Sequence, residues 1–378
     1  MRGSVALLGV VACYSPEPPL GVPCTDTSGC PTGQICVTRG GAQVCAPLGS
    51  GDDPDATLPD GPLADVPLDW WNTDWKRRRP IEVATGAAVV AGYSFAVTFD
   101  HAAQVAGGRS LASGDDLRIV RDDGLEVHRV LDTGASFDSA STTLWFATPD
   151  PIGAGATQRF WLYSDNPTAG SPPALPREVF ALADDFEGTL GQWNVDPKVE
   201  QTATRVHRGS QAVFIAEPQD ATGIGLRSKD LDLHNLVFDA WWNLDARTGA
   251  DMGQSVRHNA TSVYFTNLQP PSPTWDLSKL ENGMYSQLTP PPQGSAPPPL
   301  DTWFRVTVYA HERTMAVDIE GERFVPSTGF ATVDADPSGG VELFGYIVPS
   351  HVWWDDVTVR HFVRPEPTSE LGVEQSIR

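Results

Sequence analysis

Four cysteines near the start of the chain are the residues whose spacing points most directly to covalent chemistry. Cys24, Cys30, Cys36 and Cys45 lie within 22 residues, and no cysteine follows them. An even number of thiols in so short a stretch predicts two disulfides, with three possible pairings. The spacings of five, five and eight intervening residues lack the Cys-x-x-Cys pairs that are usual at structural zinc. We therefore expect a small cross-linked module at 20–46.

A fifth cysteine, Cys13, has a different setting. A short apolar run from Val5 to Ala12 precedes it, and Val10-Val11-Ala12-Cys13 resembles a bacterial lipobox. The resemblance implies a signal segment at 1–13, removed by cleavage before Cys13, and acyl chains on that residue. No other stretch approaches the roughly 18 apolar residues of a membrane span. We expect an exported lipoprotein that touches the membrane only through its lipid anchor, at the outer membrane or outside the cell; ordinary secretion and no export remain alternatives.

Carboxylates that could act in glycoside hydrolysis are sparse. That chemistry needs an acid and a nucleophile facing one groove, and the nearest candidate is Asp318-Ile319-Glu320-Gly321-Glu322. Glu320-Gly321 is better explained as a tight hairpin turn. The chain also has no Gly-x-Ser-x-Gly and no His-Glu-x-x-His pattern. We expect no catalytic activity and assign no catalytic residue.

Tryptophan doublets suggest a second kind of site. Half of the twelve tryptophans occur as Trp70-Trp71, Trp241-Trp242 and Trp353-Trp354. Successive side chains of a strand point to opposite faces, so each doublet sends one indole inward and one outward. An outward indole can be a sugar platform, or it can pack beneath a neighbouring domain. We take Trp241 and Trp242 as the candidate ligand-binding pair, because their strand lies in the middle of a domain.

Composition predicts the elements that position these residues. With 35 Gly, 33 Pro and almost no helical periodicity, the chain is expected to be all-β, with many short strands. The net charge of −22 argues against nucleic acid as a partner. The Asp-rich and Pro-rich stretch 47–69 is expected to be an extended spacer. The basic run Lys76–Arg79 is expected at an exposed sheet edge, where it discourages strand addition.

The segment that follows the spacer resembles a known family. Trp75 to Ile81, Asp116 to Ile119 with Asp123-Gly124, Leu144 to Phe146, and Phe160 to Asn166 are similar to the successive motifs of DUF2341, a domain of unknown function. Ser164-Asp165 replaces the family's usual Tyr-Gly. The resemblance implies a β-sandwich at 70–168, of a kind found in surface and secreted proteins, and it supplies no activity.

A second domain is expected at 179–365, before a C-terminal tail at 366–378. Its opening, Asp184 to Gly188, and its ending, Trp353 to Val359, resemble the first and last strands of concanavalin A-like jelly rolls of the lectin and glucanase type. In that fold these two strands are neighbours. Related carbohydrate-binding modules hold a structural Ca²⁺ nearby, so the resemblance implies calcium ligands at Asp185, Glu187 and Asp356, although such carboxylates are also common in turns.

A proline-rich insertion interrupts this domain. The stretch from Gln269 to Pro299 contains nine prolines and is expected to drape over one face, with Trp275 and Tyr285 pinned against it. The leading functional expectation is a non-catalytic lipoprotein that binds glycan through the jelly roll. The alternative is a structural or adhesive envelope protein that binds other proteins, and a glycoside hydrolase comes third.

Overall fold

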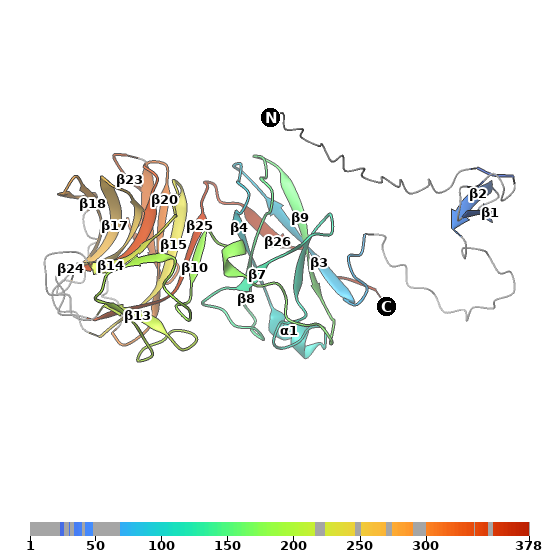
Figure 1. Ribbon diagram of the computed structural model, residues 1–378, viewed down its shortest axis with the longest axis horizontal. Helices are drawn as coiled ribbons and strands as arrows, with labels where there is room; N and C mark the ends of the chain where they lie inside the picture. The colour runs from blue at the N-terminus through green and yellow to red at the C-terminus, as the bar shows by residue number, and fades with distance from the viewer. Residues whose placement is uncertain are drawn as a thin grey trace, which may run out of the picture. The chain divides into compact units, whose positions relative to one another are not determined.

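The computed structural model describes residues 23–25, 30, 34–39, 42–47, 69–215, 224–245, 251–269, 274–289, 300–335, 337–346 and 351–377. The chain divides into two compact units, Met1–Leu63 and Ala64–Arg378, and each is described by itself. Within the described residues, helix is limited to α1 (His101–Ala106) and the 3-10 turn η2 (Pro176–Glu178), and the strands pair in antiparallel fashion (Figure 1). The expected all-β fold, two sandwiches after a disulfide module, is confirmed. The signal segment with Cys13 and nearly all of the spacer lie outside the described residues.

The first unit contains one hairpin held by two disulfides. Strands β1 (Gln34–Arg39) and β2 (Ala42–Pro47) pair in antiparallel fashion, with Cys36 opposite Cys45. Each of these two cysteines bonds outside the pair, which gives Cys24–Cys36 and Cys30–Cys45. The predicted disulfides are therefore confirmed, and the sulfurs that could have bound zinc are used in them.

The first sandwich of the second unit packs a six-stranded sheet against a three-stranded one. Branched and aromatic side chains alternate inward along its strands and form a closed core that includes Ile81, Phe95 and Phe160. The strands are β3 (Arg77–Ala84), β4 (Ser94–Phe99), β5 (Arg118–Arg121), β6 (Glu126–Val127), β7 (Arg129–Leu131), β8 (Thr142–Ala147), β9 (Thr157–Ser164), β26 (Thr368–Leu371) and β27 (Gln375–Ser376).

The end of the chain completes this first sandwich. β26 and β27 both pair with β3, so strands from the two ends of the second unit lie side by side (Figure 1). The segment 366–378 is thus part of a sheet and not a tail. The second sandwich is an insertion between β9 and β26 of the first.

This pairing also corrects the expectation for the basic run Lys76–Arg79. β3 lies between β9 and the two C-terminal strands, so it is not an exposed edge. Arg77 forms an ion pair with Glu374. The Arg78 guanidinium lies between two indoles, 3.8 Å from the ring centre of Trp161 and 4.6 Å from that of Trp70. The arginines hold the terminal segment in place, and Trp70 serves the structure, as expected for that doublet.

The second sandwich packs a nine-stranded sheet against a seven-stranded sheet. The nine-stranded sheet contains β10 (Leu182–Asp184), β12 (Val199–Thr202), β13 (Ala212–Ile215), β15 (Leu236–Leu244), β20 (Phe304–His311), β21 (Thr314–Ile319), β22 (Glu322–Val325), β23 (Ala331–Thr332) and β25 (Val352–His361). The seven-stranded sheet contains β11 (Trp193–Val195), β14 (Ile224–Ser228), β16 (Asp251–His258), β17 (Ser262–Gln269), β18 (Thr274–Glu281), β19 (Met284–Gln287) and β24 (Gly340–Tyr346).

The order of these strands matches the jelly-roll expectation. The first strand, β10, pairs with the last, β25, as Leu182 opposite Val359. The core between the sheets includes Trp193, Trp242, Trp275 and Trp354, each at most 1% exposed. Four indoles in one core supply a large part of its buried apolar area.

The proline-rich insertion is built differently from the expectation. Its middle forms the regular hairpin β18–β19, which extends the seven-stranded sheet. Trp275 points inward and is fully buried, so it is part of the core and does not pin a draped segment. Tyr285 is 52% exposed on the other side of the sheet. Residues 270–273 and 290–299 lie outside the described residues.

Polar side chains join the two sandwiches across the outer face of the nine-stranded sheet. Arg305 on β20 contacts Asp132 of the first sandwich at 3.1 Å and Asp239 of its own sheet at 3.0 Å. The Ser94 hydroxyl donates to the Val179 carbonyl at the crossing between the sandwiches. The first sandwich therefore contacts the outer face of the nine-stranded sheet. The outer face of the seven-stranded sheet lies on the other side of the second sandwich.

Candidate functional site

The two indoles of the candidate pair Trp241-Trp242 are both engaged. Trp242 is 0% exposed, and its indole N–H donates to the Gln254 amide in the core at 2.7 Å. Trp241 points the other way, as alternation requires, and stacks on His207 with ring centres 3.8 Å apart. Its N–H donates to the Thr133 hydroxyl of the first sandwich. The expectation of a sugar platform at this doublet is corrected, because the outward indole packs beneath the neighbouring sandwich.

The third doublet is structural as well. Trp354 is fully buried, and Trp353 stacks on Phe214 of β13, with ring centres 4.8 Å apart. The Arg205 guanidinium lies 4.3 Å from the centre of the same indole. A ring with a neighbour on its face offers little surface to a ligand.

The three residues predicted as calcium ligands line one cleft but do not converge. Asp185, Glu187 and Asp356 all border a space of about 1060 Å³ beside β10 and β25. Glu187 accepts hydrogen bonds from the backbone and hydroxyl of Ser210, and Asp356 contacts the His207 ring at 2.6 Å. Within the described residues, the one group of three ligand atoms that all lie within 4.8 Å of one another is made by cysteines. The carboxylates present therefore do not fit a shared calcium site.

The carboxyl of Asp355, which precedes Asp356 in β25, is buried and has a raised pKa. Asp355 is 0% exposed in β25, and burial, followed by the charge of Asp356, raises the pKa of Asp355 to about 7. Its oxygens accept hydrogen bonds from the backbone N–H groups of His207, Arg208 and Asp356. The Asp355 carboxyl thus fixes the loop that carries His207 against Trp241.

The possible hydrolase residues Asp318 and Glu320 do not form a catalytic pair. Asp318 is 7% exposed and forms an ion pair with Arg323. Glu320 and Gly321 both have positive φ, 53° and 77°, and join β21 to β22 as the predicted two-residue turn. Glu320 accepts a hydrogen bond from the backbone N–H of Arg305. These carboxylates stabilise a hairpin.

A row of side chains crosses the outer face of the seven-stranded sheet. Strand register places Glu342 of β24 opposite Ser255 of β16, and Ser255 opposite Phe265 of β17. The row continues to both edges of the sheet, and its members in spatial order are Arg227, Glu342, Ser255, Phe265, Ser278 and Gln287. Their inward neighbours, such as Leu226, Leu343 and Leu277, belong to the core, so the row itself faces outward.

Three aromatic rings form a strip that crosses this row at Phe265. The Phe265 ring lies 6.3 Å from Tyr285 and 5.4 Å from Phe344, measured between ring centres. Gly253 on β16 leaves space for the strip, because a Cβ there would lie 2.6 Å from the Phe344 ring. Tyr285 is the most exposed of the three, and Leu280, opposite it on β18, is 39% exposed. Phe265 and Phe344 are partly buried, so Tyr285 and Leu280 form the exposed end of the strip, and an exposed apolar area of this kind can be a binding surface.

Planar polar groups flank the strip on both sides. Glu342 lies 2.8 Å from the His258 ring on one oxygen and 3.5 Å from Arg227 on the other. At the opposite edge, the Gln287 amide donates to Asp276 at 2.9 Å. The Tyr285 hydroxyl lies 2.9 Å from that of Ser278. The face therefore combines rings with fixed hydrogen-bonding groups.

Sequence reasoning missed this face. The strands around Phe265 and Phe344 were expected, but β24, which carries Phe344, pairs with β14 and β16 from a distant part of the chain. The available signal was the alternation of aromatic and core residues along β17 and β24. That signal shows which residues turn outward, but it does not show that they meet.

Comparison with known proteins gives matches among solved structures alone. No family model matches the chain, so the resemblance to DUF2341 stays a prediction, and no curated protein matches it. Solved structures similar to part of it include "Cellulose induced protein, Cip1", with 16% identity over 47% of this chain and 96% of that one, at a TM-score of 0.38. A carbohydrate-binding module, CBM66, from Bacillus subtilis has 11% identity over 46% of this chain and 94% of that one, at 0.33. Galectin LEC-6 of Caenorhabditis elegans has 8% identity over 39% and 96%, at 0.29. At these scores no property of those proteins is carried over to this chain.

Proposed function

We propose that the protein is a non-catalytic glycan-binding protein, and that the outer face of the seven-stranded sheet holds the glycan. The carrying observation is the strip of Tyr285, Phe265 and Phe344 between two sets of planar polar groups. A pyranose ring has an apolar face of C–H groups and a rim of hydroxyls. A flat aromatic surface beside rigid acceptors and donors complements both parts.

The geometry favours an extended ligand over a single enclosed sugar. The aromatic residues lie on β24, β17 and β19, so the strip runs across the strands. Neighbouring strands are about 4.8 Å apart, so five adjacent strands give the face a width of roughly 20 Å. That width suits several units of a chain. The polar groups at the two ends, Glu342 and Gln287, would then contact different sugar units.

Preorganisation supports this proposal. Glu342 is held by His258 and Arg227, and Tyr285 by Ser278, so binding does not need to order these side chains. Fixing a rotamer-rich side chain on binding costs about 0.5–1.5 kcal/mol, and that cost is reduced here. The first sandwich contacts the other sheet, which leaves this face clear of the joint between the sandwiches.

The experiment that tests the proposal is retardation of the purified full-length protein in native gels cast with a panel of neutral and acidic polysaccharides. We expect at least one polysaccharide to retard the wild-type protein, with no release of reducing ends. A panel that leaves migration unchanged throughout, together with an empty glycan array, contradicts the proposal. Protein partners trapped by crosslinking in intact cells would instead support the adhesive alternative.

We also propose that the protein is exported and anchored through Cys13. The two disulfides support export, because such bonds persist in oxidising compartments. Labelled palmitate should be incorporated into the wild-type chain in the native host and not into the Cys13→Ser variant. Equal labelling of both proteins contradicts the anchor.

A further inference from the structure

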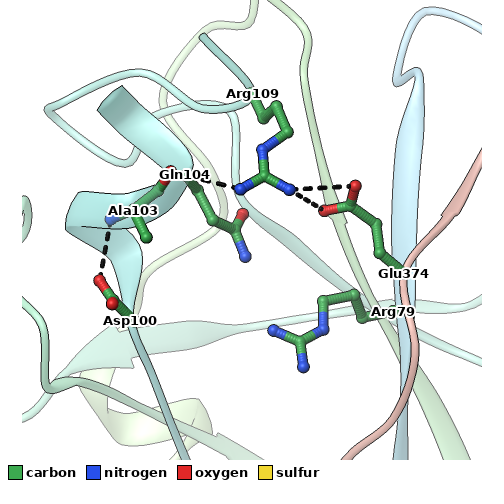
Figure 2. A pocket seen from close by; sticks show the side chains of 6 residues that line it. All are labelled: Arg79, Asp100, Ala103, Gln104, Arg109 and Glu374. Carbon is green, nitrogen blue, oxygen red and sulfur yellow. Dashed lines mark hydrogen bonds and ion pairs between the residues drawn. The ribbon is translucent and has the colours of Figure 1, made fainter. Parts of the chain in front are cut away.

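A second, smaller pocket lies on the first sandwich. It has a volume of about 290 Å³ and lies between α1, β3 and the segment that joins β26 to β27 (Figure 2). Its lining is made by Arg79, Asp100, Ala103, Gln104, Arg109 and Glu374. Nothing in the proposed glycan face uses these residues.

The two carboxylates of the pocket already have donors. Asp100 accepts from the backbone N–H of Ala103 at 2.8 Å, as the N-cap of α1. Glu374 lies 2.5 Å from Arg77 and 3.3 Å from Arg109. Both carboxylates therefore already have hydrogen-bond or ion-pair partners, and we do not infer a cation site from them.

The Gln104 amide is a further polar group of the pocket. Gln104 is 5% exposed, and Figure 2 shows no hydrogen bond from its side-chain amide to another residue that lines the pocket. Figure 2 shows its amide pointing into the space beside Arg79. No atom of this amide is among the fully buried polar atoms without a partner in the described residues, so the amide remains accessible from the pocket and can form hydrogen bonds with a ligand there.

The Arg79 guanidinium faces the same space, and its terminal nitrogens make only one long hydrogen bond within the described residues. Its Nε donates to the Gly372 carbonyl at 2.9 Å, and Nη2 lies 3.5 Å from the Leu371 carbonyl. Among the described residues no carboxylate lies within 4.0 Å of this guanidinium, whereas Arg77 and Arg109 both have one. Burial lowers the pKa of Arg79. Among Arg77, Arg79 and Arg109, Arg79 is the one without a carboxylate within 4.0 Å in the described part of the chain, although the charge of Glu374 still acts on it.

We propose that this pocket binds the carboxylate group of a small organic acid, either a free acid or an acidic sugar. One oxygen would accept from the terminal nitrogens of Arg79 and the other from the Gln104 amide N–H. Charge-assisted hydrogen bonds of this kind are the strong ones. One guanidinium without a close carboxylate among the described residues matches a single negative charge, and 290 Å³ is room for an acid the size of a hexuronate.

The test is calorimetric titration of the full-length protein with acetate, galacturonate and galactose. We expect galacturonate to bind and neutral galactose not to bind; acetate that binds as tightly as galacturonate identifies the carboxylate alone as the ligand. Gln104→Met, which keeps the size of the side chain and removes no hydrogen bond to another residue lining the pocket, should weaken binding about tenfold or more. Arg79→Met should do the same, and Gln158→Met on β9 is the matched control.

Three results would overturn the proposal: no binding of either acid, binding that survives Gln104→Met, or tighter binding of inorganic sulfate than of both acids. The test of this pocket can succeed or fail independently of the test of the glycan face. Tyr285→Ala should leave galacturonate binding at this pocket unchanged, and Gln104→Met should leave polysaccharide retardation unchanged wherever the polysaccharide is neutral.

Discussion

The indole N–H of Trp241 donates a hydrogen bond to the hydroxyl of Thr133, 2.9 Å away and in the other sandwich. The same indole lies against His207, whose backbone N–H donates to Asp355. An aromatic residue that could have been a ligand platform is therefore part of the joint between the two sandwiches. The chain also passes twice between the sandwiches, before β10 and after β25. The ion pair of Arg305 with Asp132 completes this joint.

Trp241→Ala should destabilise the second unit by about 3 kcal/mol, because it removes a large packed ring together with its hydrogen bond. Thr133→Val removes only the acceptor and should cost about 1 kcal/mol. Chemical unfolding measures both losses. Polysaccharide retardation should persist in the two variants under native conditions; its loss in Thr133→Val alone would place ligand contacts at the joint and not on the seven-stranded sheet.

Stability should fall as pH rises through the titration of Asp355. An unfolded Asp ionises near pH 4, whereas in the folded protein burial and the charge of Asp356 raise the pKa of Asp355 to about 7. Between these values the native state holds a proton that the unfolded state releases, so the unfolding free energy decreases with pH, and the full cost is present above about pH 7. We expect this residue to lower stability by about 1 kcal/mol or more between pH 5 and pH 8.

The Asp355→Asn variant is the control for this pH dependence of the unfolding free energy, because an Asn side chain does not ionise. The unfolding free energy of the wild type, relative to that of the variant, should decrease from pH 5 to pH 8 in urea titrations. The variant is also expected to lose some stability, because Asn has one acceptor oxygen in place of the two that receive the three backbone hydrogen bonds. A wild-type advantage that grows with pH contradicts the raised pKa.

Removal of 366–378 should damage the first sandwich although it leaves 70–168 intact. β3 would lose its partners β26 and β27, and an unpaired edge invites association with another chain. We expect a lower melting temperature and oligomers in size-exclusion chromatography. Val373→Ser, at a side chain that is 84% exposed, is the matched control and should behave as wild type. A truncated protein that stays monomeric with an unchanged melting temperature would show that the C-terminal strands are dispensable.

The disulfide pairing can be checked directly. Mass spectrometry of unreduced peptides should find Cys24 linked to Cys36 and Cys30 linked to Cys45. The sequence separations of 12 and 15 residues correspond to about 3 kcal/mol of stabilisation for each bond. The Cys30→Ser, Cys45→Ser double variant should therefore be digested faster than wild type by a protease. A link between Cys24 and Cys30 would contradict the structure.

The sequence predicted the fold class well and the site poorly, for physical reasons. Strand content and the cysteine module follow from local composition, whereas the pairing of first and last strands, as at Leu182 and Val359, was implied by the jelly-roll resemblance. Alternation also predicted that Trp241 leaves the core, but not what covers it. The Phe265 strip could not be predicted, because it depends on the register between strands. The return of β26 to the first sandwich was also missed, because Pro365 and Pro367 precede it and such prolines are typical of a domain end.

The most direct test of glycan binding on the seven-stranded sheet is a comparison of two aromatic variants in the full-length protein. Tyr285→Ala changes the proposed strip, and Phe214→Ala removes a ring from the outer face of the other sheet. For a polysaccharide that retards the wild type, dissociation constants should rise about 30-fold for Tyr285→Ala, as for the loss of a binding hot spot of about 2 kcal/mol, and stay within about twofold for Phe214→Ala. Unchanged affinity in Tyr285→Ala together with a large loss in Phe214→Ala would contradict the account.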